Sequence, residues 1–204
     1  PVAAESRRLK SNRSDDRREA LFRVTHQSWG DNDAFGPVYR LMAGADPDPA
    51  VRAAALLALA RHGGPNDAPL FQSALTSTHR VERRAAAIFA QRVHMPELIP
   101  FLAERANDAE EDIQVRRDLT VALSQYENDL AVDALVSALD ASRYAIVEAG
   151  RAGLRRLTGM DHGTDSALWQ SAINASRREG QLFARSKPYV FPVYDQDPGF
   201  FDQL

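Results

Sequence analysis

The sequence predicts an all-α fold, a right-handed α-solenoid of about five stacked helix pairs that ends in a C-terminal capping helix and an extended tail. Three observations lead to this prediction. A short apolar pattern recurs about every 32 residues, prolines recur in phase with it, and the 204-residue chain has no cysteine for disulfides or thiolate metal sites. With 44% hydrophobic residues, the chain can form its core by packing alone.

The recurring pattern is V-R-x-x-A-x-x-A-L. "VRAAALLAL" from Val51 and "VRRDLTVAL" from Val115 contain it, and looser copies begin at Arg17, Val81 and Ile146. Apolar residues spaced three and four apart predict a helix in each copy. A helix as rich in alanine and leucine as the one at Val51 is apolar on two faces, and stacked neighbours would cover both.

A second series of helices is predicted between these copies. The segments "AFGPVYRLM", "NDAPLFQSAL", "PELIPFLAERA" and "DLAVDALVSAL" have apolar residues at helical spacing, and Pro37, Pro69 and Pro100 come early in the first three. Proline is tolerated in the first turn of a helix, where its missing N–H has no partner to lose. The repeating unit is therefore helix, turn, helix, link.

Charged residues beside the second helices have expected structural roles. The aspartates suited to N-caps are Asp15, Asp16, Asp46, Asp48 and Asp112. Arg52 and Arg116 are expected to pair with aspartates of adjacent repeats. Glu82 and Val147 stand where arginine is expected, so a continuous arginine ladder would be interrupted.

These residues resemble HEAT repeats, specifically the short bacterial type also found in phycobilisome-lyase-type proteins. The resemblance spans about residues 14–157. "LTGMDHGTDSALWQSAI" from Leu157 is similar to a closing segment of planctomycete-type HEAT proteins. We expect Asp165 to cap the last helix and Trp169 to seal the stack. Asp161, His162 and Asp165 are possible metal ligands, but their composition is typical of a turn before a helix, and we predict no metal.

The predicted parts are a charged lead-in over residues 1–13, the repeat array with its cap over 14–179, and an aromatic, proline-rich tail over 180–204. Gly180 is expected to end the last helix. The tail aromatics are candidate protein-binding residues: Phe183, Tyr189, Phe191, Tyr194, Phe200 and Phe201. We expect residues 181–194 to pack on the array and 195–204 to contact a partner.

The second helices should line a concave face. Counting from the valine of the pattern, the candidate binding residues on it are Arg23, Ala53, Leu57, Arg83, Ala87, Arg117, Val121 and Glu148. Leu57, Ala87 and Val121 would form an apolar strip beside Arg83 and Arg117. Such a strip would suit an acidic, partly apolar peptide.

Composition and motifs argue against several functions. With 25 basic and 28 acidic residues, the formal charge of −3 does not favour a nucleic-acid partner. None of the five histidines precedes a glutamate, so the di-iron pattern of HEAT-fold hydroxylases is missing, and nucleotide-binding and hydrolase motifs are missing too.

We therefore predict a non-catalytic protein-binding scaffold or accessory subunit without cofactor, whose partner is another protein or peptide. Two alternatives stay open. One is a HEAT-like nucleic-acid-binding protein or DNA glycosylase, which a continuous basic stripe on the concave face would favour. The other is a HEAT-type lyase or chaperone that acts on another protein.

The longest apolar run, Ala53 to Ala60, is too short for a membrane span. The chain starts with proline instead of methionine, so we expect that an initiator or a longer leader, either a secretion signal or a tag, has been removed. The resemblance to planctomycete-type HEAT proteins, many of which are exported, slightly favours an exported protein over a cytoplasmic one. The oligomeric state is left open.

Overall fold

The computed structural model describes residues 2–27, 29, 30 and 34–192. Within these residues the fold is all-α, with eleven α-helices, two short 3-10 turns and no strand. The chain divides into two compact units. The first holds the helices up to Val93 and also Pro192, and the second runs from His94 to Phe191. The predicted all-α class is confirmed.

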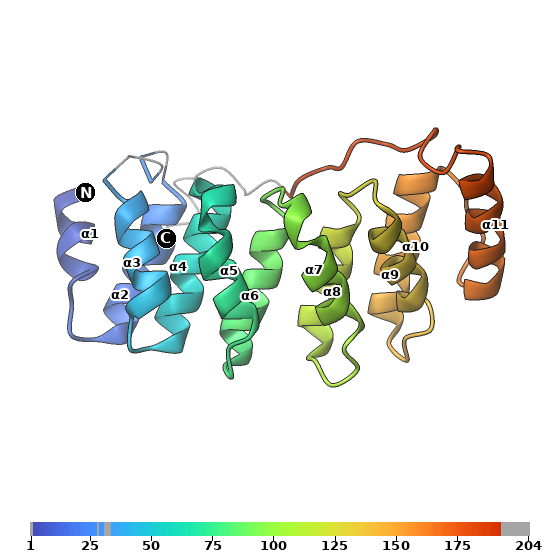
Figure 1. Ribbon diagram of the computed structural model, residues 1–204. Helices are drawn as coiled ribbons and strands as arrows, with labels where there is room; N and C mark the ends of the chain where they lie inside the picture. The colour runs from blue at the N-terminus through green and yellow to red at the C-terminus, as the bar shows by residue number, and fades with distance from the viewer. Residues whose placement is uncertain (1, 28, 31–33, 193–204) are drawn as a thin grey trace, which may run out of the picture. The chain divides into compact units, whose positions relative to one another are not determined.

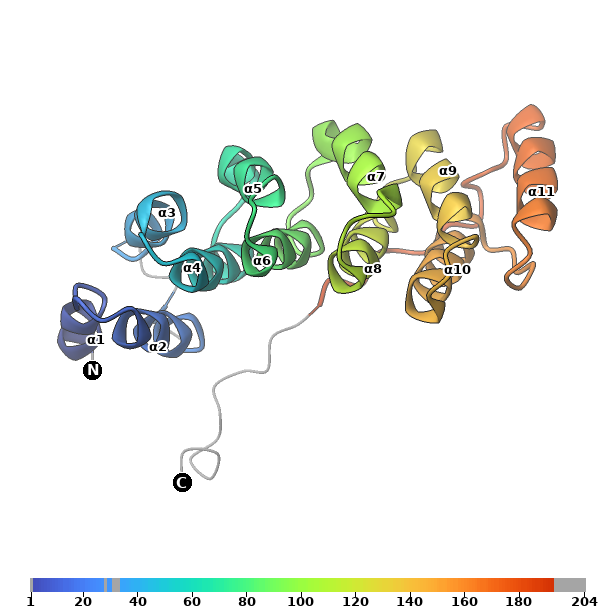
Figure 2. The same ribbon diagram turned by 90° about the horizontal axis from the view of Figure 1, so that it is seen from below.

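The first unit is built from three helix pairs. The pairs are α1 (Val2–Arg8) with α2 (Ser14–Thr25), α3 (Gly36–Ala45) with α4 (Pro49–His62), and α5 (Ala68–Leu75) with α6 (Arg80–Ala90). A 3-10 turn, Pro65–Asp67, precedes α5. In Figure 2, α2, α4 and α6 form one row, and α3 and α5 lie in a second row. Because α4 packs against α2, α3 and α6, its alanine-rich surface is covered on more than one face.

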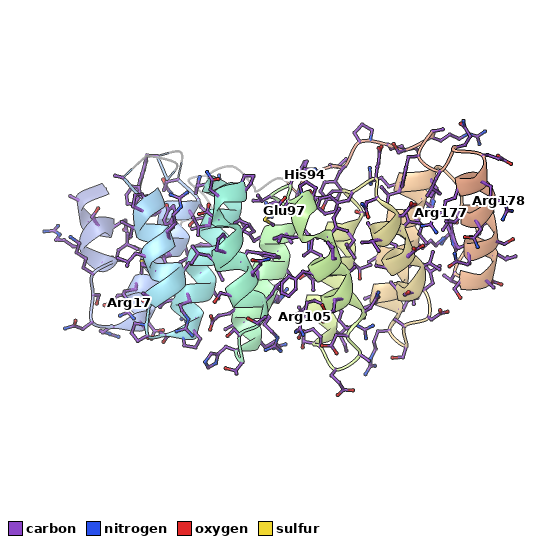
Figure 3. The ribbon with its side chains drawn as sticks, viewed as in Figure 1. Arg17, His94, Glu97, Arg105, Arg177 and Arg178 are labelled. Atoms are coloured by element: carbon purple, nitrogen blue, oxygen red, sulfur yellow. The ribbon has the colours of Figure 1, made fainter. Side chains whose placement is uncertain are left out.

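The second unit has two pairs and a final helix (Figure 1). They are α7 (Ile99–Asn107) with α8 (Ile113–Leu123), α9 (Asp129–Ala138) with α10 (Tyr144–Thr158), and α11 (Ser166–Arg178), with a 3-10 turn at Pro96–Leu98. Arg177 extends from α11 toward α9 (Figure 3), where it donates to Asp129 at 2.9 Å and to Asp133 at 2.8 Å. The described chain thus has five pairs and a cap, as predicted.

Local sequence signals place the helix ends. Pro37, Pro69 and Pro100 lie in the first turns of α3, α5 and α7, as predicted. Asp48 caps α4, where its Oδ1 accepts from the backbone N–H of Ala50 at 2.8 Å. Asp112 caps α8 in the same way. Each cap satisfies an amide that has no partner within its helix.

The other three aspartates are not caps, contrary to the sequence prediction. Arg13 occupies the N-cap position of α2, and Asp15 and Asp16 lie in its first turn. Asp46 instead binds the Arg17 side chain. The predicted lead-in also contains a helix, α1, which packs against α2.

The closing segment forms the predicted capped helix. Asp165 Oδ1 accepts from the N–H groups of Ala167 and Leu168, both at 3.0 Å. Trp169 is 0% exposed, and its indole N–H donates to the Gly163 carbonyl at 2.9 Å. A tryptophan that is buried and hydrogen-bonded in this way seals the last layer.

Asp161 also has a structural role in this turn. It accepts from Arg151 Nη2 at 2.9 Å and from the Gly163 N–H at 3.1 Å, and the hydrogen bond from Arg151 is the main reason why its pKa is lowered. Among the described residues, no three histidine, aspartate or glutamate side chains are grouped as metal ligands.

After α11 the chain turns back along the second unit. Gly180 has a φ of +66°, which allows the Gln181 N–H to reach the Ser176 carbonyl at 2.9 Å. Leu182 is buried, and the Lys187 N–H donates to the Arg156 carbonyl at 2.9 Å. Residues 181–187 therefore lie against α10 and α11.

Candidate functional site

A groove with a volume of about 840 Å³ opens on the row formed by α2, α4 and α6 in the first unit. Its floor is mainly apolar, with Phe22 from α2, Ala53, Ala54 and Leu57 from α4, and Val81 and Ile88 from α6. The small alanines of α4 leave room between the larger side chains of α2 and α6. This difference in side-chain size creates the depression.

Two large apolar side chains of the groove are open to solvent. Phe22 is 63% exposed and Val81 is 44% exposed. Leu57 and Ile88, which also line the groove, are half-buried. Single exposed apolar residues are common on protein surfaces, but a contiguous concave group of them is characteristic of binding sites.

The Phe22 ring packs against a neighbouring ring. The ring centroids of Phe22 and His26 are 4.3 Å apart, and His26 Nδ1 lies 2.7 Å from the Phe22 carbonyl oxygen. These contacts hold the two side chains, which lie one helical turn apart on α2, against each other. A ligand would therefore meet a Phe22 side chain that is already partly ordered.

The two edges of the groove differ in charge. On the α2 edge, Arg18 pairs with Asp15 at 3.0 Å, and Glu19 pairs with Arg23. On the α6 edge, the charged lining residues are Arg84 and, just beyond the helix, Arg92. The α6 edge is thus basic and the α2 edge is mixed. A continuous basic stripe of the kind that a phosphate backbone needs is not present among the groove residues.

The groove contains only part of the predicted binding surface. Ala53 and Leu57 line it as expected. Ala87 is 0% exposed, so its prediction as a surface residue was wrong. Arg23 lies beside the lining residues and contacts Glu19 and Glu5. Arg83 points to the preceding turn, where it donates to the Ser77 carbonyl at 2.9 Å.

The arginine contacts explain these differences. Arg17, Arg52 and Arg83 each donate through Nη1 to a carbonyl six residues earlier, at 2.9, 2.6 and 2.9 Å respectively. The three arginines are therefore equivalent positions of the repeat. The first copy begins one residue before Arg17, and the third copy begins one residue after Val81. With this corrected register, the residues expected on the concave face are Phe22 instead of Arg23 and Ile88 instead of Ala87.

The same correction changes the predicted ion pairs. Glu82 does not replace an arginine; it accepts from Arg52 at 2.6 Å. Arg52 therefore pairs with a glutamate of the next repeat, where an aspartate was expected. Arg116 donates to the Ala106 carbonyl at 3.1 Å, so its expected aspartate partner was also wrong.

The remaining candidates on second helices belong to the second unit and do not line this groove. Arg117 contacts Asp118 at 2.9 Å, and Glu148 lies 3.8 Å from Arg151. Val121 is half-buried.

The tail aromatics are only partly described. Phe183 and Tyr189 are half-buried, and Phe191 is exposed, with its ring centroid 4.8 Å from that of Tyr189. Tyr194, Phe200 and Phe201 lie outside the described residues. Among the tail residues up to 192, Leu182 is the most buried; the sequence does not single it out because it is one apolar residue without periodic neighbours.

Comparison with known proteins agrees with this architecture. Residues 6–92, which include most of the first unit, match the sequence family described as HEAT repeats. A search among curated proteins found no match to the chain. No helix in the described ranges combines the length and apolar character that crossing a membrane requires. Residues 6–92 are therefore similar in sequence to HEAT repeats, in agreement with the stacked helix pairs of the first unit.

Proposed function

We propose that this protein is a non-catalytic scaffold or accessory subunit that binds a segment of another protein in the groove of α2, α4 and α6. The observation that carries the proposal is the apolar floor of this groove, with Phe22 and Val81 open to solvent. Covering a large apolar side chain contributes about 1.5–3 kcal/mol. Two or three such contacts would support a specific complex.

The charge of the groove edges defines the partner further. Arg84 and Arg92 favour acidic residues on the side of the ligand that faces α6. The mixed α2 edge, with Arg18 beside Asp15, adds little net charge. The expected ligand is an amphipathic helix or an extended segment whose apolar side chains enter the groove and whose acidic residues face α6.

The groove also suits binding because its walls are already packed. Ala55, Ala58 and Leu59 of α4 are buried between neighbouring helices, so the floor is fixed by the same contacts that hold the repeats together. Binding of a ligand would therefore cost little conformational entropy of the scaffold.

Selection from a random peptide library on the full chain tests the proposal. Selected peptides should carry apolar and acidic residues, and their affinity can be measured by fluorescence anisotropy. Ile88→Glu places a charge in the floor and should weaken binding at least about tenfold, which corresponds to about 1.4 kcal/mol.

A matched control is Leu41→Glu. Leu41 is an exposed leucine of α3 that does not line the groove, and its substitution should leave the affinity unchanged. If the selected peptides bind the Ile88→Glu variant as tightly as the original protein, the groove is not the binding site and the proposal fails.

A further inference from the structure

We propose that residues 193–204 of the same chain bind in the α2–α4–α6 groove and compete there with the external segment. This inference rests on the proposed function, because it names a regulator of the same site. The segment lies outside the described residues.

The described chain ends at the edge of the groove. The Pro192 carbonyl accepts a hydrogen bond from Arg92 Nη1 at 2.8 Å, and Arg92 is one of the residues that line the groove. The described chain therefore ends beside the basic α6 edge.

The sequence that follows has the chemistry expected of a ligand. "VYDQDPGFFDQL" contains the adjacent Phe200 and Phe201 and three acidic residues, Asp195, Asp197 and Asp202, but no basic residue. Its acidic residues complement Arg84 and Arg92. Its two phenylalanines complement the apolar floor.

The segment is long enough to reach across the groove. Adjacent packed helices are about 8–10 Å apart, so the distance from α6 to α2 is about 20 Å. Eight residues in an extended conformation span about 26 Å. Phe200 can therefore reach Phe22 on α2 from an origin at Pro192.

Attachment to the same chain makes even a weak interaction effective. A short flexible connection gives an effective concentration in the millimolar range. A segment with a dissociation constant of about 0.1 mM would then fill the groove most of the time and would weaken an external ligand about tenfold. A partner would have to displace the segment before binding.

Disulfide trapping tests the inference directly, because the sequence has no cysteine of its own. In the full chain, Ala54→Cys places a thiol in the groove and Gln203→Cys places one in the segment without changing its aromatic or acidic residues. The control pair is Leu41→Cys with Gln203→Cys, since Leu41 lies outside the groove. Gel mobility under mild oxidation measures disulfide formation within the chain.

We expect the groove pair to close at least about tenfold faster than the control pair. Equal rates would overturn the inference, and so would disulfides that form mainly between two chains. A second measurement uses a synthetic peptide with the sequence of residues 193–204. It should bind the Phe200→Ser/Phe201→Ser variant at least about tenfold more tightly than the original chain, and equal affinities would contradict competition.

The two proposals can fail separately. If library-selected peptides depend on Ile88 but the groove cysteine pair does not close preferentially, the inference about residues 193–204 is wrong and the proposed function stands. If the pair closes but selected peptides ignore Ile88→Glu, the groove is an intramolecular contact and the proposed function is wrong.

Discussion

Asp46 holds Arg17 through two parallel hydrogen bonds, from Nε to Oδ2 and from Nη2 to Oδ1, each 2.8 Å long. Arg17 lies on α2 (Figure 3) and Asp46 follows α3, so the pair joins the first two repeats. The hydrogen bond that Arg17 donates to Asp46 raises the pKa of Arg17, which keeps the guanidinium charged. Both side chains are nearly buried, with 11% and 6% exposed.

Asp46→Asn should lower the free energy of unfolding by about 3 kcal/mol, because it removes the carboxylate that pairs with the nearly buried, charged Arg17. Urea denaturation measures the change. Asp15→Asn is the control, since Asp15 pairs with Arg18 on the exposed surface and such pairs contribute at most about 1 kcal/mol. Equal effects of the two substitutions would show that the Arg17 pair is not important for stability.

Two adjacent residues of α6 should respond in opposite ways. Ala87→Leu inserts extra methyl groups at a fully buried site and should lower the free energy of unfolding by about 1–3 kcal/mol. Ile88→Glu should change the free energy of unfolding by less than about 1 kcal/mol because Ile88 is only half-buried, while it should weaken peptide binding at least about tenfold. Urea denaturation measures the change in stability, and fluorescence anisotropy measures the change in peptide affinity. If Ile88→Glu lowered stability and Ala87→Leu weakened binding instead, Ala87 and not Ile88 would face the groove.

Tyr126 should make stability depend on pH in the alkaline range. Its hydroxyl oxygen accepts from the Met95 N–H at 3.0 Å, and burial raises its pKa to about 12. Because the unfolded phenol has a pKa of about 10, the folded state holds the proton more tightly. The resulting stability is complete below about pH 10 and is lost as the pH rises toward 12.

Denaturant unfolding between these pH values, with Tyr126→Phe as the comparison, measures this contribution. The variant lacks the phenol proton and should lose less stability over the range than the original protein. Its Met95 N–H also loses a buried acceptor, so it should be less stable by about 1–3 kcal/mol at neutral pH. Identical pH dependence in the two proteins would contradict the assignment to Tyr126.

The cap should depend on Trp169. Trp169→Ala removes a fully buried side chain and should lower the free energy of unfolding of the second unit by about 3–5 kcal/mol. Its neighbour Leu168 is 56% exposed, and Leu168→Ala should change stability by less than about 0.5 kcal/mol. Thermal unfolding followed by circular dichroism compares them, and a small effect at Trp169 would mean that α11 does not stabilise the unit.

The sequence alone predicts the helix pairs and the prolines in their first turns. It also predicts the caps at Asp48, Asp112 and Asp165 and the burial of Trp169. These features depend on helical periodicity and on contacts between residues that are close in sequence. They do not require knowledge of how one repeat meets another.

The binding residues predicted for the first unit lie on the helices on which the groove opens, but two of them were assigned one position away from the residues that line it. Val81 matched the first letter of the repeat pattern, although it is 44% exposed. Glu82 is the buried residue, because Arg52 of the preceding repeat binds its carboxylate. A carboxylate in a buried position can be recognised only when its distant counter-ion is known.

The short helix α1 was missed for a related reason. Its charged residues resemble a solvated segment, but Leu9 just after it is buried and Glu5 lies 3.6 Å from Arg23. These contacts with α2 stabilise a helix of seven residues that local propensity alone would not maintain.

The α3–α4 pair binds the repeats on both sides: the Asp46 carboxylate binds Arg17 of α2, and Arg52 of α4, which also donates to the Asp46 carbonyl, binds Glu82 of α6. Removing the α3–α4 pair as a block would remove the acceptor of Arg17 and the donor of Glu82 together. Because Arg17 and Arg52 make the same contact with the turn before their helices, the shortened array would bring Arg17 to the place where Arg52 faces Glu82, and the new junction would keep an arginine–carboxylate pair.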